Sequence, residues 1–317
     1  MPISTSLERA IKILEKSGFY VAHIREFARS SFDIIARRDD LLIMLRVIRN
    51  IDSLSKEICN ELKIVAHHLR ASVIIVGEKS TTALLESGVM YKRYEIPVVN
   101  LESLEDLFLY GIQPLSHSAH GGFYVAFDGK LLKTMRSDQK IPLSTLAEKA
   151  GVSKRAIQMY EDGMDVSIDA AIRLEDFLGA SLIKSTDILS QIFDDMCFHF
   201  VDYSKCDTFE KDVMKALEQM GSHVIPIYRC PFNALMGEQD SIIITGITQV
   251  NPRIRRRIEI VSKISRISER RSMFVVDQLK SKKNVGGTPL VGRKEIENLS
   301  EPDDIDQLLE NRSKRSK

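Results

Sequence analysis

Cysteine is scarce in this chain, tryptophan is absent, and no long apolar run occurs. The four cysteines, Cys59, Cys197, Cys206 and Cys230, are scattered through 317 residues without any CxxC pair. Zinc sites and redox motifs need closely spaced ligands, so this spacing matches no standard metal site and indicates reduced, buried thiols. A membrane helix needs roughly 20 apolar residues, which no segment approaches, and the amino terminus lacks a secretory apolar core. We therefore expect a cytoplasmic protein with no metal and no membrane partner.

The charge of the chain is nearly balanced overall but unevenly distributed. Hydrophobic residues make up 44% and charged residues 28%, which is ordinary for a protein of two or three domains. The net charge is +1, yet residues 252–317 carry 17 Lys and Arg against 10 Asp and Glu, whereas residues 131–189 carry 8 against 9. The excess of positive charge that would attract a nucleic acid therefore lies near the carboxyl end of the chain. No P-loop or dinucleotide glycine pattern is present, so no cofactor is expected.

Residues 143–160 have the spacing of two short helices joined by a glycine turn. Small or apolar residues recur at Leu146, Ala147, Ala150, Val152, Ile157 and Tyr160. This spacing buries the inner faces of the two helices against each other. Gly151 supplies the positive φ that ends the first helix, and Ser144 and Ser153 are the predicted caps of the first and second helix. The segment is a predicted helix-turn-helix.

The second predicted helix carries side chains suited to reading DNA. In this motif the second helix lies in the major groove, and here its exposed face presents Ser153, Lys154, Arg155, Gln158 and Met159. Arg155 suits guanine O6 and N7, and Gln158 suits adenine N6 and N7. Lys154, with Ser144 and Thr145 on the first helix, is placed for phosphates. The alternative is that the two cations form only a solvated face.

The predicted domain around this motif covers residues 128–190. Residues 113–127 precede it as a linker, rich in Gly, Ser and His, and a short strand. Ser167 is the predicted cap of a helix that Gly179 closes, and Leu182–Ile192 is expected to add a further helical turn or two. Five small helices around one core would complete the domain.

This domain resembles the lambda-repressor/Cro-type helix-turn-helix, and residues 143–161 cover that motif without gaps. With its preceding strand, the run Ala147-Glu-Lys-Ala-Gly-Val-Ser-Lys-Arg-Ala-Ile-Gln-Met-Tyr-Glu-Asp-Gly163 looks like the archaeal helix-turn-helix transcriptional regulators, over nearly the whole chain. That resemblance implies control of transcription. Many lambda-repressor-type domains begin the first motif helix with a glutamine that braces a phosphate, whereas this chain has Leu143 there.

Two blocks on either side of this domain share one order of predicted elements. Residues 1–112 and 191–317 each contain an amphipathic helix that ends at a glycine and a short strand after it. Phe32-Asp-Ile-Ile corresponds to Phe232-Asn-Ala-Leu, and strands at 72–76 and 272–276 correspond as well. An αβββαβ order also arises by chance, but matches in register favour a duplicated module. The predicted fold class is mixed α/β and α, with two similar α/β modules flanking a central all-α helix-turn-helix domain, and a basic tail follows the second module.

The first module resembles the restriction-endonuclease-like fold at Asp33 and at the strand over residues 41–47. Such nucleases need an Asp and then Glu-x-Lys to hold Mg²⁺ and activate water. Met44 and Arg46 stand at the Glu and Lys positions, and the second module has Asn233, Ile244 and Gly246 at the three places. One carboxylate cannot hold magnesium alone, and a thioether offers no hard oxygen ligand. Both modules are therefore expected to be degenerate.

Together these patterns predict a sequence-specific DNA-binding transcriptional regulator that is not an enzyme. Residues 153–161 would form the recognition helix on double-stranded DNA, and an effector of unknown chemistry is possible in principle. One helix-turn-helix reads few base pairs, so we expect a homodimer joined through the flanking modules. Two alternatives stay open: a DNA-processing or repair-associated protein of the nuclease-like fold, and a protein-interaction or effector-sensing module.

Overall fold

The computed structural model describes residues 3–24, 27, 30–119, 121–190, 203–237, 241–250, 254–279, 283–299 and 301–313. The chain forms two compact units. One contains Met1–Ile13, Ile48–Ser53 and Ile74–Ser190, and the other contains Leu14–Val47, Leu54–Val73 and Gln191–Lys317. Within the described ranges, no helix is both long and apolar enough to cross a membrane.

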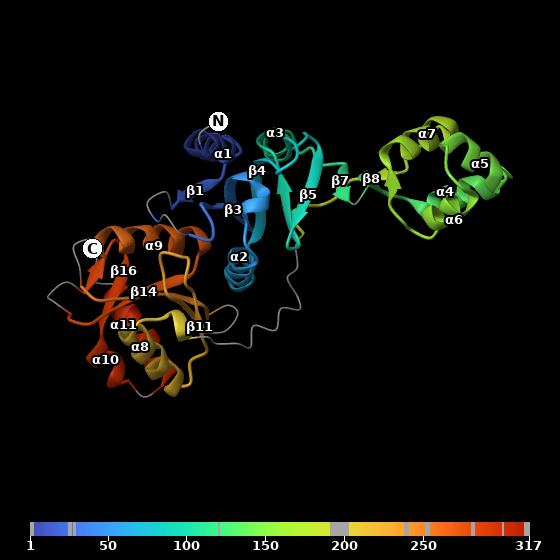
Figure 1. Ribbon diagram of the computed structural model, residues 1–317. Helices are drawn as coiled ribbons and strands as arrows, with labels where there is room; N and C mark the ends of the chain where they lie inside the picture. The colour runs from blue at the N-terminus through green and yellow to red at the C-terminus, as the bar shows by residue number, and fades with distance from the viewer. Residues whose placement is uncertain are drawn as a thin grey trace. The chain divides into compact units, whose positions relative to one another are not determined.

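The amino-terminal α/β module is built from a sheet with helices (Figure 1). Its elements, in chain order, are α1 (Ile3–Lys16), β1 (Tyr20–His23), β2 (Ile34–Arg38), β3 (Leu41–Asn50), the 3-10 turn η1 (Ile51–Ser53), α2 (Lys56–Leu69), β4 (Ser72–Lys79), β5 (Val89–Arg93), β6 (Ile96–Val99), α3 (Leu101–Glu105) and the π-helix η2 (Asp106–Tyr110). Ser55 caps α2 through its hydroxyl, which accepts from the Ile58 N–H at 3.4 Å. Strand β3 is nearly continuously apolar, as expected for a strand covered on both faces.

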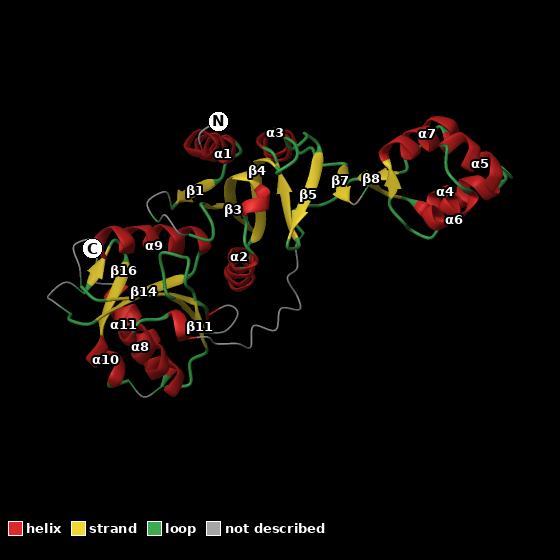
Figure 2. Ribbon diagram, viewed as in Figure 1, coloured by secondary structure: helices red, strands yellow, loops and turns green. Residues whose placement is uncertain are grey.

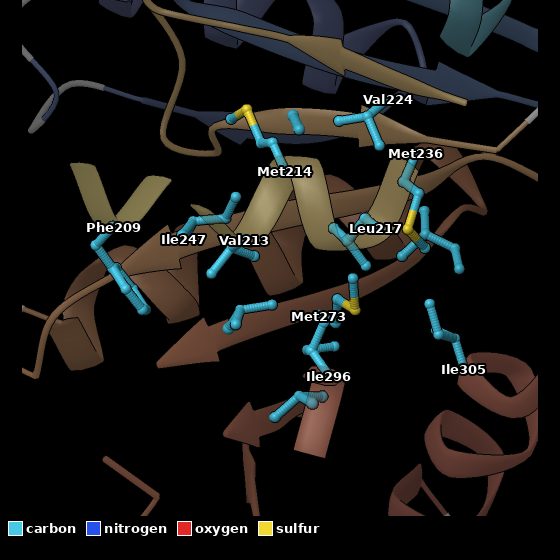
Figure 3. Packing of buried hydrophobic residues seen from close by; sticks show 14 of the residues in the cluster. Phe209, Val213, Met214, Leu217, Val224, Met236, Ile247, Met273, Ile296 and Ile305 are labelled. Carbon is cyan, nitrogen blue, oxygen red and sulfur yellow. The ribbon is translucent and has the colours of Figure 1, made fainter. Parts of the chain in front are cut away.

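The carboxyl-terminal module has the same kinds of elements. They are the 3-10 turn η3 (Tyr203–Lys205), α8 (Thr208–Gln219), β11 (Val224–Pro226), β12 (Ala234–Met236), β13 (Ile243–Thr248), α9 (Ile254–Ser268), β14 (Arg271–Val276), β15 (Asn284–Val285), β16 (Thr288–Gly292), α10 (Arg293–Glu297) and α11 (Pro302–Ser313). Asp207 and Glu210 form a reciprocal capping box that starts α8. Figure 3 shows α8 lying over the sheet, with Val213 and Leu217 pointing toward the strand residues Met236 and Met273.

Sheet topology supports the predicted duplication. The strand order β1-β2-β3-β4-β6-β5 in the first sheet is repeated as β11-β12-β13-β14-β16-β15 in the second. In both copies the second and third strands are antiparallel, as are the last two, and β4–β6 and β14–β16 are both parallel. Two unrelated modules would not be expected to share this mixture of directions together with residue matches in register.

Individual hydrogen bonds repeat as well. The Asp33 N–H donates to the Leu45 carbonyl at 2.8 Å, and the Asn233 N–H donates to the Thr245 carbonyl at 2.8 Å. The Val47 N–H donates to the Asp33 carboxylate at 2.7 Å, and the Ile247 N–H donates to the Asn233 side-chain oxygen at 2.7 Å. Phe32 and Phe232, matched from sequence, are both fully buried. The predicted register between the modules is therefore the observed one.

Helix α9 of the second module packs on β1 and β2 of the first within one compact unit. Arg37 on β2 donates to the carbonyls of Ile267 at 2.6 Å and Ser268 at 3.2 Å, and it pairs with Glu269 at 3.2 Å. These carbonyls end α9 and have no partner within the helix, so the guanidinium supplies donors that the helix end lacks.

A second connection runs from α2 to the loop after β11. The Glu61 carboxylate, only 5% exposed, accepts from the backbone N–H groups of Tyr228 at 3.0 Å and Arg229 at 2.7 Å. Ser31 donates its N–H to the Arg229 carbonyl at 2.6 Å, and its hydroxyl lies 3.3 Å from the Cys230 sulfur. Burial raises the pKa of Glu61, while the two N–H groups oppose that rise. The two modules are thus joined inside a single chain.

The helical domain contains β7 (Ser116–Ala119), β8 (Gly122–Phe127), α4 (Gly129–Asp138), α5 (Leu143–Ala150), α6 (Lys154–Glu161), β9 (Val166–Ser167), α7 (Ile168–Leu178) and β10 (Ile183–Lys184). Figure 2 shows its four described helices together, with short strands beside them. Leu132, Leu146, Ile157 and Leu174 are fully buried in one core. Strand β7 lies inside the segment whose composition favoured a linker, and it pairs with both β5 and β8.

The structure corrects three expectations for helices and tail. Residues 182–190 contain strand β10 and no helical turn. The Glu175 carboxylate accepts from the N–H groups of Leu182 at 2.5 Å and Ile183 at 2.8 Å, and this segment pairs with β8. Residues 191 and 192 lie outside the described residues. Five helices were predicted, and the described part contains four. Helix α11 includes residues 311–313 of the basic tail expected over residues 311–317, and its Arg312 is buried and hydrogen-bonded to Glu295 at 2.5 Å. Residues 314–317 lie outside the described residues.

Candidate DNA interface

The turn between α5 and α6 is fixed by the two residues predicted to shape it. Gly151 has φ +71° and places the Val152 N–H on the Ala147 carbonyl at 2.9 Å. The Ser153 hydroxyl accepts from the Ala156 N–H at 3.1 Å and caps α6. Ala147 is buried, which allows the close helix crossing, as are Ile157 and Tyr160 on α6. The motif therefore folds as its spacing predicts.

The predicted base-reading residues share one exposed surface on α6. Lys154, Arg155, Gln158 and Met159 are all exposed, and so is the capping residue Ser153. One helical turn separates Lys154 from Gln158 and Arg155 from Met159, so the four side chains form two adjacent rows. Within the described residues, neither Lys154 nor Arg155 forms an ion pair with an acidic side chain. Both cations are therefore available to a ligand.

The two predicted contact residues on α5 are placed less favourably. Ser144 is exposed but lies inside the first turn, because the helix begins after Pro142 and has no side-chain cap. The prediction that Ser144 caps α5 is therefore wrong: proline at position 142 fixes the backbone entering the helix and takes the position that a serine cap would need. Thr145 is half-buried beside the core residue Leu146. Ser167 occupies the predicted cap position of α7 but makes no side-chain cap hydrogen bond.

A partly buried ion pair holds α4 against the end of the recognition helix. Arg136 donates to both oxygens of Glu161, with distances of 2.5 Å from Nε and 3.1 Å from Nη2. The side chains are only 20% and 5% exposed, and the bond to Glu161 raises the pKa of Arg136. Bidentate pairs of this kind fix orientation as well as distance. No sequence spacing indicates this pair, because the two residues are 25 positions apart.

The start of α4 also packs closely against the carboxyl end of α6. A Cβ added to Gly129 would lie 2.0 Å from the Tyr160 carbonyl oxygen, so only glycine fits there. The Asp128 side chain caps α4 through the Leu131 N–H at 3.0 Å and pairs with Lys184 at 2.9 Å. The recognition helix is therefore held at its carboxyl end by backbone contact and by an ion pair, while its amino-terminal face stays open.

The nuclease-like position in the first module is occupied by internal hydrogen bonds. The Asp33 carboxylate bonds Arg46 at 3.0 Å through one oxygen and the Val47 N–H at 2.7 Å through the other. Burial raises the pKa of Asp33, with Arg46 opposing the rise. Met44 is buried beside this pair and offers no oxygen ligand. In the part of the chain that the structure describes, no group of three or more His, Cys, Asp or Glu residues is arranged to hold a metal ion.

The second module rebuilds the same arrangement with different residues. Asn233 replaces the aspartate, and Arg257 from α9 donates to its side-chain oxygen at 2.7 Å and to the Pro231 carbonyl at 2.6 Å. Gly246 stands where the first module has Arg46, and the Phe274 ring fills the space that a side chain there would need. An arginine from a different element therefore bonds the equivalent side chain in each module. The sequence pattern gives no sign of this role, because it depends on α9 packing against residues 231 and 233.

Two stretches of the chain match known domain families. Residues 4–114 match the PD-(D/E)XK superfamily domain, and residues 132–184 match the helix-turn-helix family. The predicted classes of both parts are confirmed, and together they define a protein that joins a nuclease-like α/β module to a helix-turn-helix domain. No solved structure matches the chain.

Relatives that match almost end to end identify the family. A protein of Methanosarcina acetivorans is 34% identical and one of Archaeoglobus fulgidus is 32% identical, with 96% and 97% of each chain covered. A protein of Methanococcoides burtonii is 34% identical over 98% of both chains. Each is named "Putative HTH-type transcriptional regulatory protein". The chain belongs to this archaeal helix-turn-helix family.

Proposed function

We propose that this protein is a sequence-specific DNA-binding transcriptional regulator, with residues 153–161 as the recognition helix in the major groove. The observation that carries the proposal is the α6 surface, on which Lys154, Arg155, Gln158 and Met159 are exposed together and the two cations have no acidic partner in the described part of the chain. The names of the family's members agree with this role. The partner is double-stranded DNA.

Each predicted contact residue has a proposed role. Arg155 and Gln158 read base edges, because their planar groups match the paired acceptors and donors of guanine and adenine. Met159 offers an apolar contact at 42% exposure, suited to a thymine methyl group. Lys154, Ser153, Ser144 and Thr145 contact phosphates and set the register of the helix in the groove.

The flanking modules are proposed to be non-catalytic. Asp33 already has a partner on each oxygen, and the positions that would complete a magnesium site hold Met44, Arg46, Asn233 and Ile244. We further propose a cytoplasmic location, and domain limits of 1–112 and 191–317 for the two modules, 113–127 for the connection and 128–190 for the helix-turn-helix domain. Two copies are proposed to bind a two-fold symmetric operator, because one such domain reads too few bases for tight binding.

The recognition surface is tested by removing its two base-reading groups together. Arg155→Ala with Gln158→Ala should reduce affinity for a selected genomic fragment roughly 30-fold or more, since each good bidentate contact contributes about 1–3 kcal/mol of discrimination. Binding to unrelated DNA should fall far less. The matched control is Lys133→Ala with Gln139→Ala, which likewise removes one cation and one amide from exposed positions at α4 and its carboxyl end. Unchanged selectivity in the recognition variant would show that α6 does not read the operator.

A further inference from the structure

The outer face of α7 has a pattern that is complementary to itself. Its exposed residues are Asp169, Ile172, Arg173, Asp176 and Phe177, and the last four place an apolar residue on each side of two opposite charges. Ile172 is 48% and Phe177 is 38% exposed, so both apolar side chains are accessible to a partner. If two copies of α7 pack antiparallel about a two-fold axis, the axis passes between residues 174 and 175. Arg173 then lies level with Asp176 of the partner subunit, and Ile172 lies level with Phe177 of the partner subunit.

We propose that α7 is the surface through which two copies of this chain associate when they bind DNA. This inference rests on the proposed function, which needs two helix-turn-helix domains on one operator. An isologous contact requires one patch to match itself, and this patch does so in charge and in apolarity. The Arg173–Asp176 pair forms twice by symmetry, and the apolar residues flank the two pairs on each side.

The two charged groups are free to make these pairs. Asp176 forms no ion pair within the described residues. Arg173 uses one nitrogen to donate to the Ala150 carbonyl at 3.4 Å, which orients the guanidinium and leaves its other donors for a carboxylate. Lys149 lies 5.5 Å from the Phe177 ring centroid and covers one face of that ring only. Arg173 and Phe177 are thus each held by a contact within the domain.

Contacts elsewhere in the chain also favour α7 as the surface that binds a second copy. The two α/β modules are joined to each other inside the chain through Arg37 and Glu61, so that joining surface is not available to a second copy. Figure 1 places α7 and α6 on opposite sides of the helical domain, so a contact through α7 leaves the recognition helix open. An 11-residue helix is about 16 Å long, so the contact surface is small and the association is weak in solution. Two neighbouring half-sites on DNA strengthen the association, because they raise the local concentration of one copy near the other.

A charge-swap series in the full-length chain tests the proposal. Arg173→Asp and Asp176→Arg should each weaken self-association at least about 10-fold in sedimentation experiments at low salt, because each brings two like-charge pairs together. The double variant Arg173→Asp/Asp176→Arg should restore association to within about 3-fold of the unchanged chain. Asp138→Arg, which makes the same charge change on an exposed residue of the same domain, should leave association unchanged.

Each other outcome counts against the α7 surface. The proposal is wrong if the unchanged chain stays monomeric up to a few hundred micromolar, or if the single variants associate normally. It is also wrong if the double variant stays monomeric while hydrogen exchange shows that α7 is folded. DNA binding is scored separately with the Arg155→Ala/Gln158→Ala variant. Selective binding without α7-dependent association removes this inference alone, whereas α7-dependent association without any DNA affinity removes the proposed function and leaves the dimer surface standing.

Discussion

Arg136→Ala is expected to weaken the helix-turn-helix domain by about 3 kcal/mol, because it leaves the Glu161 carboxylate buried without a partner. Removing one member of a fully buried pair costs about 3–5 kcal/mol. The lower value applies here, since Arg136 is 20% exposed and its removal admits some water to a carboxylate that is 5% exposed. The carboxylate cannot relax easily, because Gly129 and α4 pack directly on the end of α6.

Hydrogen exchange is the suitable assay for this change. A multidomain chain does not unfold in two states, so a single unfolding midpoint would not isolate the domain. Exchange at the buried Ile157 and Tyr160 amides reports the local opening, and a loss of about 3 kcal/mol corresponds to roughly 150-fold faster exchange. Glu259→Ala, which breaks the exposed pair with Arg255, should change local stability by less than about 0.5 kcal/mol.

The double variant Arg136→Met/Glu161→Leu separates the ion pair from packing. Two apolar side chains of similar volume remove both charges, so this variant should recover most of the loss and could exceed the original stability. The reasoning fails if Arg136→Ala costs less than about 1 kcal/mol, or if the apolar double variant is as unstable as the single one. Either result would mean that the pair is well hydrated and does not hold α4 to α6.

Two further predictions concern the α/β modules. Burial raises the pKa of Glu61, so this carboxyl binds its proton more tightly in the native state than in the unfolded state. Its contribution to stability therefore falls as the pH rises from the pKa of the unfolded state through the higher pKa of the native state. The difference in local stability between the unchanged chain and Glu61→Gln, measured by hydrogen exchange at the buried Leu62 and Val65 amides of α2, should therefore decline from pH 4 to pH 7. A difference that grows with pH would refute dominance by burial. With Mg²⁺ present, the purified protein should leave plasmid DNA uncut, and Asp33→Ala should not change that result; cleavage that Asp33→Ala abolishes would identify an active nuclease site.

Local sequence was sufficient to predict the helix-turn-helix and the exposed face of its second helix. Gly151 and Ser153 act within a few residues of their own position, and the small and apolar spacing has one helical interpretation. The duplicated modules could also be read from sequence, because residues such as Phe32 and Phe232 keep their register. The short strand β10 was missed since its ordering depends on the Glu175 carboxylate.

Only the tertiary structure decided which distant side chains meet. The sequence determined the elements, the motif and the repeat, because capping, periodicity and turn chemistry act over short separations. It did not show that Arg257 replaces Arg46 across modules, or that Arg136 finds Glu161, because such partners are chosen by packing between elements. The joining of both modules inside one chain through Glu61 is of the same kind, since a buried carboxylate is recognised only when its donors are in place.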